Sequence, residues 1–112
     1  EAKKLIIEHL MASKIPFVDL GMGINVVNNS LRGTVRKTLI TPENCSYLDK
    51  IAMGKTADED IYSQNIQISE LNALNAILGI LAWKKLNGFY LTEDIIYNST
   101  FIIDEEEIKN ET

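Results

Sequence analysis

Three stretches of the 112-residue chain predict an α/β domain, either complete or a piece of a larger one. Residues 1–13 place apolar side chains among charged ones at near-helical spacing, which predicts an amphipathic helix. Residues 16–20, PFVDL, form a short apolar run directly after it, and helix-then-strand order favours a parallel sheet. Within residues 73–83 only Asn75 is plainly polar, so a helix there must be covered on more than one face.

The first half of the chain then reads as a helix followed by strands. Pro16 ends the first helix, because proline disfavours the helical region for the residue before it. Gly21 and Gly23 are expected to form a tight turn after the first strand. A second β-prone run covers residues 24–27, and residues 28–30 have turn chemistry. Residues 31–41 alternate roughly between apolar and polar side chains, which predicts a hairpin with one solvent-exposed face.

The second half is organised around the long apolar helix. Residues 46–53 predict a short helix, and residues 54–60 a polar loop. The long helix is expected to start at an N-cap, Ser69, and to end near residue 87 with Gly88 as the C′ residue. Its two apolar faces consist of Leu71, Leu74, Leu78 and Leu81, and of Ala73, Ile77, Ile80 and Trp83.

Three further expectations concern this half. Gly79 is a poor residue for a helix interior, so another backbone is expected to approach it closely. Residues 95–103 predict a last strand, placed at an edge of the sheet, and residues 104–112 an acidic, disordered tail.

Charge and composition exclude several classes of function. The net charge of −5 argues against nucleic-acid binding, which needs clustered Lys and Arg, and against anionic membrane surfaces. The longest apolar run is shorter than the ~20 residues that span a bilayer. The single cysteine, Cys45, forms no internal disulfide, which fits a reducing compartment. We therefore expect a cytoplasmic protein.

Motifs for catalysis or metal binding are weak. The Gly21–Gly23 segment lacks the third glycine of a dinucleotide-binding loop, because Val26 occupies that position. His9 has no further ligands at coordinating spacing, and no motif supports Cys45 as a nucleophile. Arg32, Arg36 and Lys37 put positive charge on one hairpin. The simpler interpretation is that these three side chains lie on a solvent-exposed face of the sheet. The alternative is that they contact a phosphate group or an acidic partner.

The order of these segments resembles the C-terminal half of the ThiF family, the E1-like adenylyltransferases. In that family a strand with a small-residue end leads to an antiparallel segment containing a glycine, then to a loop and a long helix ending in glycine. The residues that carry the resemblance are PFVDLGMG, LRGTVRKTLITP, Leu74-Asn75-Ala76 and WKKLNG at 83–88. The likeness covers about residues 1–103 and is greatest to an uncharacterised bacterial branch.

The resemblance implies a partial Rossmann-like fold: a mixed sheet with an antiparallel segment and one long buried helix. It also implies ATP- and Mg²⁺-dependent adenylation of the C-terminus of a ubiquitin-like or sulfur-carrier protein by a dimeric parent protein. The family's nucleotide loop, catalytic arginines and Mg²⁺-binding aspartate lie upstream of the matching part. We therefore assign no catalytic, cofactor-binding or metal-ligating residue here, and expect this part to be inactive alone and to form homo-oligomers. The candidate partner-binding residues are Gly21, Gly23, Arg32, Arg36 and Lys37.

Two departures and one alternative accompany this hypothesis. The family's paired zinc-binding CxxC motifs are absent, and residues 60–65 lack the cysteine that some members place just before the long helix. Thioester transfer is therefore not expected even for the parent protein. The alternative is a non-catalytic α/β interaction module whose long helix pairs with its own copy.

Overall fold

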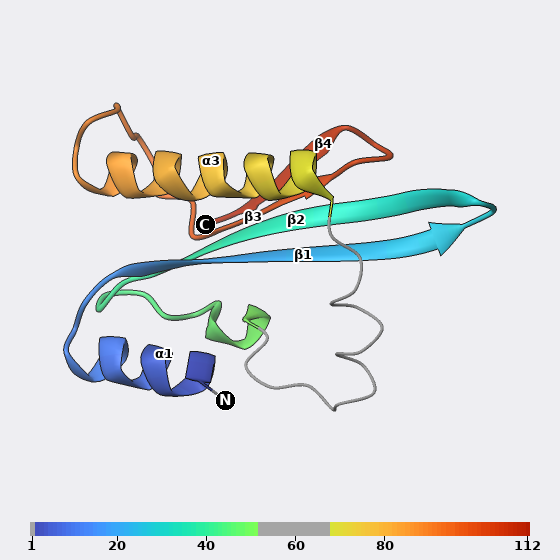
Figure 1. Ribbon diagram of the computed structural model, residues 1–112. Helices are drawn as coiled ribbons and strands as arrows, with labels where there is room; N and C mark the ends of the chain where they lie inside the picture. Colours follow the sequence, from blue (N-terminus) through green and yellow to red (C-terminus); the bar gives the residue numbers. More distant parts are fainter. Residues whose placement is uncertain (1, 52–67) are drawn as a thin grey trace.

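The computed structural model describes residues 2–51 and 68–112 and arranges them in three layers (Figure 1). Helix α3 (Ser69–Leu86) covers one face of a four-stranded sheet. Helix α1 (Ala2–Ala12) and the short 3₁₀ helix η1 (Leu48–Lys50) lie on the opposite face. The α/β class is therefore confirmed. The loop predicted at residues 54–60 lies outside the described part of the chain.

All four described strands pair antiparallel, in the order β1-β2-β3-β4. They are β1 (Phe17–Val27), β2 (Ser30–Ile40), β3 (Asn98–Ile102) and β4 (Glu107–Glu111). The parallel pairing expected from helix-then-strand order is absent among these residues. The physical reason is local: β1 is followed by a tight hairpin, which can join only antiparallel neighbours.

The β1–β2 hairpin is longer than the sequence pattern predicted. Gly21 and Gly23 do not form a turn but lie inside β1, opposite Arg36 and Thr34. The chain instead reverses at the predicted polar turn, where Asn28 and Asn29 have φ angles of 51° and 65°. Left-handed conformations at both central positions are typical of the hairpin turns that match strand twist, and asparagine tolerates them.

The C-terminal segment also differs from its prediction. Residues 104–112, expected as a disordered tail, contain β4, which pairs with β3 from Glu107 to Glu111. The last predicted strand, residues 95–103, is therefore interior: β3 lies between β2 and β4. The acidic composition hid this strand because its side chains are exposed, so it lacks the buried apolar positions that mark most strands in a sequence.

Helix α3 packs on the sheet along one face only. A side chain at Gly79 would meet Leu20 of β1, so the close approach expected there comes from a side chain rather than from a backbone. Asn75, the polar residue of the apolar run, is buried and donates a hydrogen bond to the Gly21 carbonyl of β1, at 3.0 Å. The opposite face, with Ile77, Ile80 and Trp83, is exposed. Within this chain the described residues thus cover one face of the helix, and covering of the second face stays a prediction.

Both helices end in the same capping motif. Gly88 follows α3 with a φ of 81°, as predicted, and the Gly88 and Phe89 amides donate to the Lys85 and Lys84 carbonyls. After α1 the equivalent position is Lys14, with a φ of 58°. This arrangement is the Schellman motif, in which the left-handed residue is usually glycine because a Cβ atom is strained there.

On the α1 side, a small apolar cluster fixes the helix to the sheet. Ile7 of α1, Ile40 at the end of β2 and Ile51 after η1 are buried against one another. Phe17 and Leu48 pack around them. The cluster closes one end of this face and leaves the remainder to polar side chains.

We expect Lys14→Gly to raise the free energy of unfolding by about 1 kcal/mol, because it removes a side chain from a left-handed position. Denaturant unfolding measures the change. The matched variant, Gly88→Ala, should lower the free energy of unfolding by a similar amount at the equivalent cap of α3. A destabilised Lys14→Gly protein would contradict this account of the α1 terminus.

Candidate functional site

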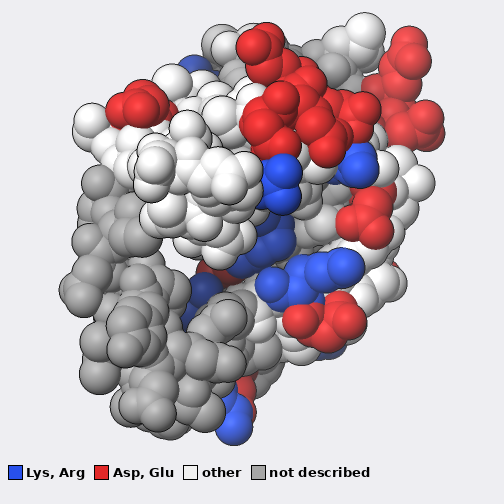
Figure 2. Space-filling model, turned by 90° about the vertical axis from the view of Figure 1, so that its right-hand side faces the viewer, with Lys and Arg blue, Asp and Glu red and all other residues white. Residues whose placement is uncertain are grey.

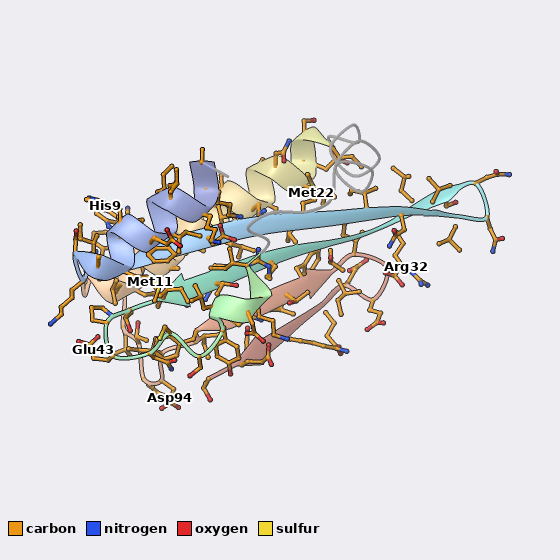
Figure 3. The ribbon with its side chains drawn as sticks, turned by 90° about the horizontal axis from the view of Figure 1, so that it is seen from below. His9, Met11, Met22, Arg32, Glu43 and Asp94 are labelled. Atoms are coloured by element: carbon orange, nitrogen blue, oxygen red, sulfur yellow. The ribbon has the colours of Figure 1, made fainter. Side chains whose placement is uncertain are left out.

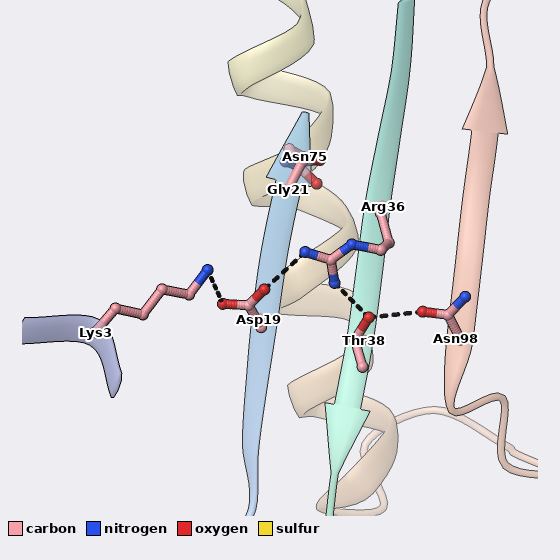
Figure 4. A network of polar contacts seen from close by, with 7 residues as sticks. All are labelled: Lys3, Asp19, Gly21, Arg36, Thr38, Asn75 and Asn98. Carbon is pink, nitrogen blue, oxygen red and sulfur yellow. Dashed lines mark hydrogen bonds and ion pairs between the residues drawn. The ribbon is translucent and has the colours of Figure 1, made fainter. Parts of the chain in front are cut away.

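The α1 face of the sheet carries an ion pair that crosses the β1–β2 hairpin (Figure 4). Asp19 of β1 receives Arg36 Nη2 on one carboxylate oxygen at 2.8 Å and Lys3 Nζ of α1 on the other at 2.9 Å. The side chains of Asp19 and Arg36 are mostly buried, so water screens their attraction poorly. These three side chains join α1, β1 and β2.

The ion pair continues as a row of hydrogen bonds across the sheet. The other guanidinium nitrogen, Arg36 Nη1, donates to the Thr38 hydroxyl, which donates to Asn98 Oδ1 of β3 at 2.6 Å. The Asn98 amide in turn donates to Glu111 Oε1 of β4 at 2.8 Å. Every strand therefore contributes at least one member, and each polar side chain along the row has a hydrogen-bonding partner.

Gly21 leaves the space that this row needs. It lies directly opposite Arg36, and a Cβ atom built on Gly21 would collide with the Arg36 guanidinium. The glycine is thus needed because it lets the arginine of the neighbouring strand pack closely, and not because the chain turns there. Gly23, two residues further on, meets only Thr34 at ordinary distance.

The structure separates the three cations predicted as one positive surface. Arg36 belongs to the row on the α1 face, whereas Lys37 points to the α3 face, because successive residues of a strand alternate. Arg32 is exposed near the hairpin end and lies 3.4 Å from the Asp104 carboxylate. Figure 2 shows lysine and arginine side chains lying between acidic ones on this side of the molecule.

The α3 face instead contains a pocket that the sequence interpretation missed. It has a volume of about 440 Å³ and lies between the second half of α3 and strands β2, β3 and β4. Its apolar walls are Leu39, Leu78, Leu81, Ala82, Leu86, Ile95, Phe101 and Ile108, and its polar lining groups include Lys37, Lys85, Thr92, Asp94, Ser99 and Asn110. We call it the α3–β4 pocket. Its size falls within the range of sites for small molecules.

Lys37 is the buried charge of the α3–β4 pocket. Only 8% of the residue is exposed, and its Nζ donates to the Ile96 carbonyl at 2.8 Å. Among the described residues no carboxylate lies within ion-pair distance of it. Burial, and then the nearby positive charge of Lys85, lower the pKa of Lys37 from 10.5 to about 8.

A sequence signal for this lysine existed. Val35, Lys37 and Leu39 share one face of β2, and the two neighbours of Lys37 on that face are buried apolar residues. A charged side chain between two buried positions of a strand is unusual enough to mark a site. The rough alternation of residues 31–41 concealed it, because Arg36 and Thr38 on the opposite face are polar too.

The remaining candidates stay isolated. His9 is an exposed residue of α1, and Figure 3 shows it on that helix, away from Arg32 and Asp94. Cys45 is an exposed free thiol. Within residues 2–51 and 68–112, no three histidine, cysteine or carboxylate side chains gather as metal ligands. None of the described helices combines the length and apolar character needed to cross a membrane.

None of the family models, curated proteins or solved structures with which we compared the chain matches it.

We expect the protein to become more stable as the pH rises from about 8 to about 10.5. Over that range unfolded Lys37 keeps its proton while folded Lys37 has lost it, so the unfolded state binds more protons. The gain should be about 1–3 kcal/mol in urea unfolding. Lys37→Met should remove it and stabilise the protein at pH 7, whereas Lys109→Met on β4 should preserve it. An equal gain in Lys37→Met would contradict the burial of a charge.

Proposed function

We propose that this chain is the C-terminal half of a ThiF/E1-like adenylyltransferase domain. Two observations support the proposal: the residues that resemble the family, and the order along the chain of the strands and the helix that these residues form. FVDLGMG lies in β1, the glycine-containing LRGTVRKTLI segment lies in the antiparallel strand β2, and Gly88 follows the end of α3. This is the succession of strand, antiparallel segment and long helix that the resemblance implies.

The observation that carries the proposal is the unpaired outer edge of β1. Among the described residues β1 pairs only with β2, so no described strand pairs with the other edge of this eleven-residue strand. Proteins rarely leave so long an edge open. A Rossmann-like domain would place its next strand here and make the sheet mixed.

Both helices beside that edge are consistent with a larger sheet or assembly. Leu5 and Ile6 of α1 are exposed on one side, and Ile77, Ile80 and Trp83 of α3 are exposed on the other. One helix lies on each face of the sheet, and a doubly wound domain also carries helices on both faces, which supports the proposal. In this proposal ATP and Mg²⁺ bind to the upstream half of the domain, and this chain supplies sheet, helix cover and partner surface in the cytoplasm.

The carrier protein would meet the hairpin side of the molecule. Three of the proposed partner-binding residues already have structural contacts. Gly21 packs against Arg36, Arg36 pairs with Asp19, and Lys37 lines the α3–β4 pocket. Gly23 and Arg32 remain exposed toward the hairpin end. Arg32 is thus the exposed one of the three predicted cations, and an acidic ubiquitin-like or sulfur-carrier protein would replace Asp104 as its partner.

The exposed face of α3 favours a second candidate function, a non-catalytic interaction module that pairs with its own copy. The residues Ala73, Ile77, Ile80 and Trp83 recur at helical spacing on that face. Such a stripe is the pattern by which one helix packs against another. Adenylation activity discriminates between the two candidates, whereas dimerisation is compatible with both.

We expect a protein that joins this chain to a nucleotide-binding half to exchange radioactive pyrophosphate into ATP when a carrier protein is supplied, because adenylation is reversible. The isolated chain should show no exchange, since the ATP-binding residues would lie elsewhere. Cys45→Ser should retain exchange, because an adenylate forms without a thioester. Failure of exchange with every carrier, together with a stable dimer, would favour the interaction module.

We expect the chain to dimerise at micromolar concentration through the exposed face of α3. Ile77→Glu should yield a monomer in multi-angle light scattering, because it places a charge in an apolar contact. Val26→Glu, at the distant hairpin end, is the matched control and should remain dimeric. Trp83 is the single tryptophan and is 59% exposed in the isolated chain. Its emission should shift to shorter wavelength in the dimer and not in Ile77→Glu. A wild-type monomer would overturn this expectation.

A further inference from the structure

We infer that the α3–β4 pocket binds a small monocarboxylate with an apolar body, of the kind that a medium-chain fatty acid represents. The inference is independent of adenylation. It concerns the side of the sheet formed by β2, β3 and β4, whereas the adenylyltransferase proposal rests on the open edge of β1.

The first argument is the incomplete bonding of Lys37. An ammonium group has three N–H donors, and the described residues offer one acceptor, the Ile96 carbonyl. A buried charge is costly unless it is paired and hydrogen-bonded. An anion in the pocket would receive the remaining donors and supply the missing negative charge.

The second argument is a row of polar groups that crosses three strands beside Lys37. Lys37 lies directly opposite Ser99 of β3, and Ser99 lies directly opposite Asn110 of β4. The Ser99 hydroxyl donates to Asn110 Oδ1 at 2.8 Å, which orients the asparagine amide. Directly opposed residues have Cβ atoms about 5 Å apart. Lys37 and Asn110 therefore lie two strands apart with Ser99 between them, and the Lys37 ammonium and the Asn110 amide offer donors to an anion from two sides of the pocket.

The third argument concerns the remaining walls. Leu39, Leu81, Phe101 and Ile108 surround the space next to this polar row with apolar carbon. A hydrated inorganic anion would gain no binding free energy from such walls. An alkyl chain would gain it, because burial removes its apolar surface from water. The combination of one charged end and an apolar remainder selects an amphipathic anion.

The charged groups that face Lys37 favour a single negative charge. Lys85 of α3 lines the same pocket, and Asp94 lines it from the segment that connects α3 to β3. Both are exposed, so water screens them better than it screens Lys37. Two lysines and one aspartate leave a net charge of +1, which a monocarboxylate neutralises.

Isothermal titration of the full 112-residue chain at pH 7 tests the proposal, with decanoate as the probe. We expect saturable binding of one decanoate per chain and at least tenfold weaker binding of decanol and decylamine. Lys37→Met should weaken decanoate binding at least tenfold, because a charge-assisted hydrogen bond is lost. Lys109→Met is the matched control: it removes a lysine from the opposite face of β4 and should leave the affinity unchanged.

The pH dependence gives a readout that needs no variant. Lys37 loses its proton above a pH of about 8, so wild-type affinity for decanoate should fall at least tenfold between pH 7 and pH 9.5. Lys37→Met should show a smaller change. Circular dichroism should show that the variant remains folded.

Three outcomes would overturn the inference. Equal affinity for decanol and decanoate would reveal an apolar cavity without an anion site. Absence of saturable decanoate binding would exclude the ligand class. Undiminished binding by a folded Lys37→Met protein would show that the carboxylate lies elsewhere.

Discussion

The backbone pairing of β2 is the constraint on which the rest of the structure depends. All its residues pair with β1 on one side, and five of them pair with β3 on the other. Beyond its exposed first three residues, the strand also lies between two layers, with α1 and η1 on one side and α3 on the other. Because side chains alternate along a strand, a shift of one residue in this register would exchange the contents of the two faces.

That register gives two neighbouring cations opposite roles. Arg36 points to the α1 face, where Asp19 and Thr38 occupy both ends of its guanidinium. Lys37 points to the α3 face, where its charge meets a carbonyl and an apolar pocket. A compensated ion pair stabilises the join between strands, whereas an uncompensated buried cation makes the folded state less stable below its pKa. A bound anion would compensate the charge of Lys37 and so stabilise the folded state, whereas Arg36 already has its carboxylate partner.

The proposed functions use different parts of the sheet. The outer edge of β1 and the exposed faces of the helices would continue a larger domain or meet a second copy. The α3–β4 pocket lies at the other side, between α3 and strands β2 to β4. Assembly at β1 therefore leaves the pocket's lining strands in place. Helix α3 contributes to both, with Leu78 and Leu81 facing the pocket and Ile77 and Ile80 facing outward.

The sequence by itself determined the elements whose signals are local: the α/β class, the asparagine turn and the end of α3 at Gly88. These depend on backbone preferences of a few adjacent residues. Only the tertiary structure decided the antiparallel order, the place of Gly21 inside β1, the strand at Glu107–Glu111 and the exposure of one face of α3. It also decided the candidate site, because Lys37, Ser99 and Asn110 are distant in sequence and meet only through strand register. Register is set by the pairing of two strands, and the residues of one strand do not specify which residues of another strand they will lie opposite.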